Sequence, residues 1–101
     1  MTLSICIPIY NFDVRSLAEN LRNQAAALSL DCELLLIDDG SLDRWRMVNR
    51  KVRQLEGINY TELPENVGRA RIRNLLASES SGDWLLFLDC DVVLPDDKFL
   101  K

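Results

Sequence analysis

The chain has 101 residues, of which 48% are hydrophobic and 28% charged, a composition typical of one folded domain and not of a disordered segment. Its 12 basic and 16 acidic residues give a net charge of −4, which argues against binding to nucleic acid or to an anionic membrane. The chain contains no histidine, which excludes histidine-based catalysis and histidine-ligated zinc within these residues.

The first predicted elements are a strand and a helix. Residues 3–9 form a short apolar run rich in β-branched residues, and Pro8, which lacks a backbone donor, suits the end of such a strand. Asn11 or Asp13 can cap the helix that follows, because apolar side chains recur at helical spacing over residues 14–28.

A second strand and helix follow. The apolar run at residues 32–37 predicts the strand, which ends in the acidic turn Asp-Asp-Gly-Ser at residues 38–41. The glycine permits a backbone turn that other residues resist, and the serine can cap a helix over residues 45–55. The exposed face of that helix is strongly basic, and we interpret it as a solvated surface.

A third strand, with weaker and alternating apolar character, is predicted at residues 58–63. Asn66 is well placed to cap a helix over residues 69–77. Gly68 in the first turn of that helix lowers its helix propensity, which is reasonable if a ligand must approach the backbone closely.

The last predicted strand delivers two carboxylates. Five consecutive apolar residues, 84–88, predict a strand buried on both faces, and it continues directly into Asp89, Cys90 and Asp91. Residues i and i+2 of an extended chain point to the same side, so both acids can reach one ligand while Cys90 points away. Such a pair suits Mg²⁺ or Mn²⁺ more than zinc.

The order β-α-β-α-β-α-β indicates an α/β fold, a doubly wound parallel sheet between helices on both faces. In such sheets ligands bind beyond the carboxyl ends of the strands. Three of the four predicted strand ends carry polar or acidic groups, and they converge at that edge. The chain lacks the glycine-rich loop of a dinucleotide-binding domain and the lysine loop of a P-loop nucleotidase.

Four motifs in order resemble those of glycosyltransferase family 2, which has the GT-A fold. They are Ile-Pro-Ile-Tyr-Asn at 7–11, Ile-Asp-Asp-Gly-Ser at 37–41, Glu-Asn-Val-Gly-Arg-Ala-Arg-Ile-Arg-Asn at 65–74 and Leu-Asp-Cys-Asp at 88–91. The resemblance spans nearly the whole chain. It implies a sheet order of 3-2-1-4 and a site for a nucleotide-diphospho-sugar donor, most simply a UDP-sugar.

The resemblance also implies roles for individual residues. Pro8, Tyr10 and Asn11 would lie beside the nucleotide base, and Asp39, or alternatively Asp38, would accept a hydrogen bond from it. The segment of Asn66, Gly68 and Arg71 would lie against the nucleotide or its phosphates. Asp91 would bind Mn²⁺ or Mg²⁺ directly, and Asp89 would contact the sugar or support the metal.

The same resemblance implies that the catalytic base comes from a segment beyond Lys101, so residues 1–101 would be the donor-binding part of a truncated domain that binds without turnover. Asp96 and Asp97 are expected in the first turn of a helix starting at Pro95. The last strand would leave an open sheet edge through which copies could self-associate. Two alternatives stay open: a non-catalytic nucleotide-binding or assembly module, and a nucleotidyltransferase.

Three cysteines, Cys6, Cys32 and Cys90, are odd in number and have no CxxC spacing, which favours reduced thiols. No apolar run approaches the roughly 20 residues of a membrane span. We therefore expect a cytoplasmic location.

Overall fold

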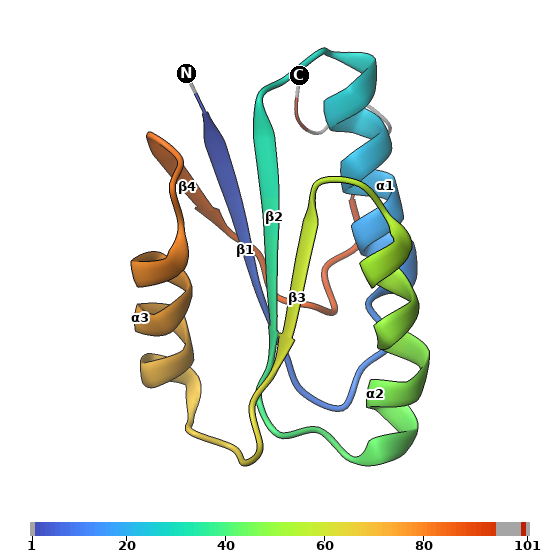
Figure 1. Cartoon of the computed structure of the whole chain (residues 1–101), viewed down its shortest axis with the longest axis vertical. Helices are drawn as coiled ribbons and strands as arrows, with labels where there is room; N and C mark the ends of the chain where they lie inside the picture. Colours follow the sequence, from blue (N-terminus) through green and yellow to red (C-terminus); the bar gives the residue numbers. More distant parts are fainter. Residues whose placement is uncertain (1, 95–99, 101) are drawn as a thin grey trace.

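The computed structural model describes residues 2–94 and residue 100. In these residues strands and helices alternate along the chain (Figure 1). The elements are β1 (Leu3–Ile9), α1 (Arg15–Ala27), β2 (Cys32–Asp38), α2 (Asp43–Asn49), the 3-10 helix η1 (Arg50–Gln54), β3 (Ile58–Glu62), α3 (Arg69–Glu79) and β4 (Trp84–Phe87). None of the described helices is long and apolar enough to cross a membrane. The helix expected from Pro95, with Asp96 and Asp97, lies outside the described residues.

The four strands form one sheet in the order β3-β2-β1-β4, and every neighbouring pair is parallel. Leu3 at the start of β1 pairs with Cys32 of β2 on one side and with Trp84 of β4 on the other. The predicted order 3-2-1-4 is therefore confirmed. Because all strands run the same way, their carboxyl ends lie at one edge of the sheet, the lower edge in Figure 1.

Helices cover both faces of the sheet, α1, α2 and η1 on one side and α3 on the other (Figure 1). Alternate residues of β1 supply the two cores: Ile5, Ile7 and Ile9 join the cluster that includes α1, and Cys6 joins the cluster that includes Ile72 of α3. The predicted three-layer, doubly wound α/β/α architecture is confirmed.

The prediction that residues 84–88 form a strand buried on both faces is wrong. β4 covers only Trp84–Phe87, and within the described residues it lies at the edge of the sheet with β1 as its one neighbour. The side chains of Trp84 and Leu85 are 61% and 45% exposed. An apolar run predicts a strand but does not report whether a second strand or helix covers it.

Two helix boundaries also differ from the prediction. The helix expected over residues 45–55 is α-helical only to Asn49 and then tightens into η1. Ser41 does not cap it, because Leu42 occupies the N-cap position. Instead, the Ser41 hydroxyl accepts a hydrogen bond from the backbone N–H of Asn11 at 2.8 Å.

Candidate functional site

A cleft of about 440 Å³ opens where the carboxyl ends of β1, β2 and β4 meet the start of α3. All four motifs contribute to its lining, together with Phe12 just after the first motif. The lining residues are Pro8, Ile9, Tyr10, Phe12, Asp39, Asn66, Gly68, Arg69, Ile72, Asp89, Cys90 and Asp91. Segments far apart in the sequence therefore converge on one cavity. This is the edge at which parallel α/β sheets bind ligands.

Asp39 organises the loop on one side of this cleft. Its side chain is only 5% exposed, and its carboxylate accepts hydrogen bonds from the backbone N–H of Val67 at 2.7 Å and of Gly68 at 3.2 Å. The Asn66 amide donates a third, at 3.1 Å. The prediction that Asn66 caps α3 is wrong, because Gly68 occupies the N-cap position and Asn66 instead binds Asp39. The buried carboxylate thus holds this loop in shape.

Gly40 allows this loop to pack closely. Its φ of +76° is rarely adopted by residues with a side chain, and an added Cβ would lie 2.5 Å from the backbone nitrogen of Asn66. Gly68 also has a positive φ, +94°, but a Cβ there would meet nothing within 4 Å. At position 68 the positive φ alone favours glycine. At position 40 both the positive φ and the close approach of the Asn66 backbone favour glycine.

Asp38, the last residue of β2, faces Arg46 of α2 and does not line the cleft. It is fully buried, and one carboxylate oxygen accepts from the backbone N–H of Ser41 at 2.8 Å and faces the Arg46 guanidinium at 3.4 Å. Arg46 also donates to the carbonyl of Leu63, just after β3. Asp38 therefore joins the turn after β2 to the loop after β3. Of the two neighbouring acids, only Asp39 faces the cleft.

The loop after β1 contributes an aromatic wall. Pro8 and Tyr10 line the cleft, and the Tyr10 side chain is 53% exposed. Asn11 does not line it; the Asn11 side-chain oxygen accepts from the backbone N–H of Leu42 at 2.9 Å, which joins the loops after β1 and β2. Sequence reasoning missed Phe12, an exposed aromatic residue two positions after Tyr10 that also lines the cleft.

The acids after β4 lie on the other wall. Asp89 and Asp91 are both exposed and both line the cleft. Cys90 between them is half-buried and packs against the core cluster on the α1 side, although it too borders the cleft. Burial raises the pKa of the Cys90 thiol, so it stays protonated at neutral pH. The two carboxylates are thus the cation-binding groups that this segment offers.

Arg69, and not the predicted Arg71, is the arginine at the cleft. A guanidinium nitrogen of Arg69 lies 3.3 Å from a carboxylate oxygen of Asp89, and both side chains are largely exposed. Arg71 is exposed on α3 and does not line the cavity. The signal that could have indicated Arg69 is its position directly after Gly68, where α3 begins.

The carboxylates fit a hard divalent cation shared with a ligand. No other described residue donates a hydrogen bond to the Asp91 carboxylate, so its oxygens are available, and Asp89 holds only the exposed contact with Arg69. The described residues contain no group of three or more acidic, cysteine or histidine ligands. Mg²⁺ is commonly bound by one or two carboxylates, with substrate phosphates and water as its remaining ligands. Asp89 and Asp91 provide such a pair.

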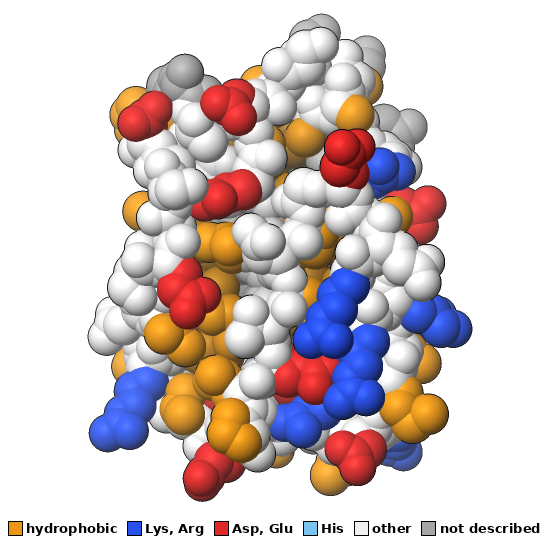
Figure 2. Space-filling model, in the orientation of Figure 1, with side chains coloured by type: hydrophobic (Ala, Val, Ile, Leu, Met, Phe, Trp, Pro, Cys, Tyr) orange, Lys and Arg blue, Asp and Glu red, His pale blue; other side chains and the backbone are white. Residues whose placement is uncertain are grey.

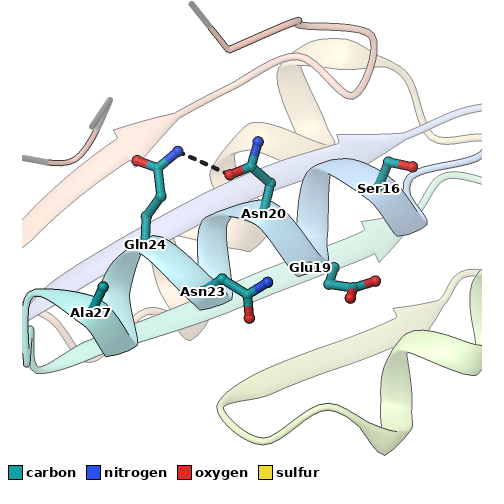
Figure 3. A pocket seen from close by; sticks show the side chains of 6 residues that line it. All are labelled: Ser16, Glu19, Asn20, Asn23, Gln24 and Ala27. Carbon is teal, nitrogen blue, oxygen red and sulfur yellow. Dashed lines mark hydrogen bonds between the residues drawn. The ribbon is translucent and has the colours of Figure 1, made fainter. Parts of the chain in front are cut away.

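Two other surface features, a hollow on α1 and a basic surface near α2, do not bring together residues from several strand ends. A hollow of about 520 Å³ lies against the outer face of α1 (Figure 3), lined by Ser16, Glu19, Asn20, Asn23, Gln24 and Ala27. All six residues come from one helix, and none lies at a strand end. Figure 2 shows basic side chains gathered on the α2 side of the molecule. In that region Arg46 pairs with Asp38 and Arg50 pairs with Glu62, which partly neutralises the basic charge.

Comparison with known proteins identifies the family of the chain. The model of the family described as glycosyl transferase family 2 matches residues 4–101. An uncharacterised glycosyltransferase of Haemophilus influenzae is 33% identical over 98% of this chain, which covers 40% of that protein. An N-acetylglucosaminyltransferase of Rhizobium leguminosarum bv. phaseoli is 30% identical over 99% of the chain, which covers 24% of it. The chain thus spans less than half the length of these relatives.

Solved structures share the fold. Residues 1–349 of Staphylococcus aureus TarS in complex with UDP-GlcNAc superpose with a TM-score of 0.75 and 26% identity, covering 90% of this chain and 27% of that 1–349 chain. The mannosyltransferase PcManGT from Pyrobaculum calidifontis, in complex with GDP-Man and Mn²⁺, gives a TM-score of 0.83 at 19% identity, covering 97% and 30%. At that lower identity, the second match supports the fold alone.

Proposed function

Because the chain belongs to glycosyltransferase family 2, we propose that its cleft binds the nucleotide-diphospho-sugar donor of a sugar transfer to an acceptor hydroxyl. The observation that carries this proposal is the convergence in one cavity of an aromatic wall, the buried Asp39 and the exposed pair Asp89 and Asp91. These groups match the parts of such a donor: a flat base, hydrogen-bonding N–H groups and a diphosphate that binds a cation.

The base fits the end of the cleft between the loop after β1 and Asp39. Pro8 and Tyr10 offer apolar area on stiff side chains. A carboxylate has about four acceptor positions, and the described residues donate three hydrogen bonds to that of Asp39. One acceptor position remains for an N–H of the base. Uracil carries such a donor, and the UDP-GlcNAc in the TarS complex favours a UDP-sugar as the donor.

The diphosphate fits the end of the cleft near Asp91. In this proposal Asp91 is the direct ligand of Mn²⁺ or Mg²⁺, and Asp89 contacts the sugar or supports the cation. The metal, when bound, supplies Lewis-acid stabilisation to the departing diphosphate. The Arg69 guanidinium, whose donors suit an anion, is better placed than Arg71 to contact the phosphates. The fully buried Asp38 is assigned a supporting role.

In the transfer itself, the acceptor oxygen forms a bond to the anomeric carbon of the sugar as the bond from that carbon to the diphosphate breaks. The nucleoside diphosphate leaves, and the proton of the acceptor hydroxyl passes to a base. We assign that base to a segment outside these 101 residues, so this chain alone would bind the donor without transferring the sugar.

Calorimetry tests this proposal. UDP-GlcNAc, GDP-mannose and UTP are each titrated into the chain with and without Mn²⁺. We expect the UDP-sugar to bind most tightly, to need Mn²⁺, and to lose at least about tenfold in affinity in Asp91→Asn, because one charged contact is worth about 1.5–3 kcal/mol. Asp43→Asn, an exposed acid at the start of α2 outside the cleft, is the matched control.

Two results would contradict the proposal. If UDP-GlcNAc binds equally well without Mn²⁺ and in Asp91→Asn, a metal does not bridge Asp91 and the diphosphate. A clear preference for UTP over the UDP-sugar would instead favour a nucleotidyltransferase.

A further inference from the structure

A second hollow of about 220 Å³ adjoins the cleft on the side of β4. Its lining residues are Pro8, Arg69, Arg73, Phe87, Leu88 and Asp89. Three of these, Pro8, Arg69 and Asp89, also line the donor cleft, so the two cavities meet at the Arg69–Asp89 ion pair. The residues that line only the second hollow are Arg73, Phe87 and Leu88. Binding of the donor in the cleft does not account for them.

Arg73 contacts Phe87 in a way that leaves its hydrogen-bond donors available. Its guanidinium carbon lies 4.7 Å from the centre of the Phe87 ring, a cation–π contact that holds the group beside the ring. Such a contact supplies no oxygen or nitrogen acceptor to the N–H groups of the guanidinium. No described residue accepts a hydrogen bond from Arg73. The side chain is thus oriented by Phe87 but not neutralised.

Arg69 brings a second positive charge to the same place. It lies four residues before Arg73 on α3, so the two side chains share one side of the helix. Two neighbouring guanidinium groups repel each other, and the described residues offer them one exposed partner, Asp89. An exposed pair of this kind contributes little to stability and exchanges readily for a better partner. An anion between Arg69 and Arg73 would satisfy both groups.

We propose that the second hollow binds an anionic group, phosphate or carboxylate, of the acceptor. This inference rests on the proposed donor site, because it places the acceptor beside the sugar that the cleft would hold. Arg73 would be the main partner of the anion. Arg69, which lines both cavities, would lie between this anion and the donor phosphates. The apolar surface of Phe87 and Leu88 would contact the carbon skeleton next to the anion. Arg73 belongs to the second hollow alone, which makes it the residue that separates the two ligands.

The test follows the side-chain Nε–Hε signal of Arg73 by NMR in the 101-residue chain. Inorganic phosphate is titrated into protein that is already saturated with UDP and Mg²⁺. We expect the Arg73 signal to shift and saturate, and Arg73→Gln to weaken phosphate binding at least about tenfold, the value of one charge-assisted contact. Arg73→Lys keeps the charge but loses the planar guanidinium, so its affinity for phosphate should lie between those of the wild type and Arg73→Gln.

Arg71→Gln is the matched control, because Arg71 lies on the same helix but lines neither hollow. If Arg71→Gln and Arg73→Gln weaken phosphate binding equally, the phosphate is attracted by the overall charge of α3 and not bound in the hollow, and the proposal is wrong. If UDP itself shifts Arg73 and blocks phosphate, the hollow holds a donor phosphate and the acceptor assignment is wrong. If UDP does not bind at all, the proposed function fails, and the acceptor assignment fails with it.

Discussion

The carboxylate of Asp39 is the part of the site whose removal gives the clearest prediction. Asp39→Asn keeps the size of the side chain and replaces one of its two oxygens with an NH₂ group. In the native loop, one oxygen accepts from the Val67 N–H, and the other accepts from Gly68 and Asn66. Whichever way the new amide faces, at least one backbone N–H of the loop meets a donor.

The cost follows from these contacts. A hydrogen bond to a charged group contributes about 1.5–3 kcal/mol, and a buried N–H left without a partner costs about 1–3 kcal/mol. Because the loop can relax toward water, we expect Asp39→Asn to lower the free energy of unfolding by about 2–4 kcal/mol. That is a large share of the roughly 5–15 kcal/mol typical of a domain.

Two measurements check this result. Urea unfolding should show a midpoint lower by about 1–2 M, given the usual slopes of 1–3 kcal/mol per M. Hydrogen exchange should accelerate selectively at the amides of Val67 and Gly68. Asp43→Asn, whose side chain is exposed on α2, should change neither quantity appreciably. Unchanged protection of the two loop amides in Asp39→Asn would refute the assignment of Asp39 as the residue that holds this loop.

The remaining predictions concern backbone, charge and the sheet edge. Gly40→Ala should destabilise the fold by more than Gly57→Ala in urea unfolding, because both positions have positive φ but only Gly40 would place a Cβ against backbone; equal losses would show that the contact is unimportant. Burial raises the pKa of Glu33, but hydrogen bonds from Ser4 and Ser81 outweigh it and hold the pKa below its usual range. Glu33→Gln should therefore be less stable than the wild type at pH 7, and the two should converge as the pH falls below the usual glutamate value; a difference that persists in acid would refute this. Trp84 on the open β4 edge is exposed, so we expect concentration-dependent self-association in sedimentation, weakened by Trp84→Lys; a wild-type monomer at high concentration would contradict it.

Local patterns predicted the strands and most helices because those elements depend on neighbouring residues. The run at residues 3–9 and the alternation at residues 58–63 became β1 and β3 nearly unchanged. The sheet order came from the resemblance to a family, since periodicity alone does not determine it. Residues 84–88 show the limit: their apolar character predicted a strand correctly but not its exposed edge, which depends on what lies beside it.

The site was predicted less completely because its geometry depends on contacts between distant residues. The hydrogen bond between Asp39 and Val67 spans 28 positions. The sequence therefore predicts Asn66 as a helix cap, although it is a partner of Asp39 in the structure. Asp38 is the last residue of β2 and Asp39 is the first residue after it. Both are buried, but only Asp39 lines the cleft, which two adjacent acids in a sequence do not reveal. Arg69 and Arg71 are both arginines, two positions apart on α3. Only the structure shows that Arg69 lines the cleft and Arg71 does not.

The strand order has a consequence for how the chain assembles during synthesis. β1 lies inside the sheet, yet one of its edges gains its partner only when β4, the last of the four strands, has left the ribosome. Until then β1, β2 and β3 can pair with one another, because their connections are closer in sequence and cost less entropy to close. Asp89 and Asp91 lie within four residues of the end of β4. The cleft that we propose for the donor therefore takes shape only when β4 docks onto β1.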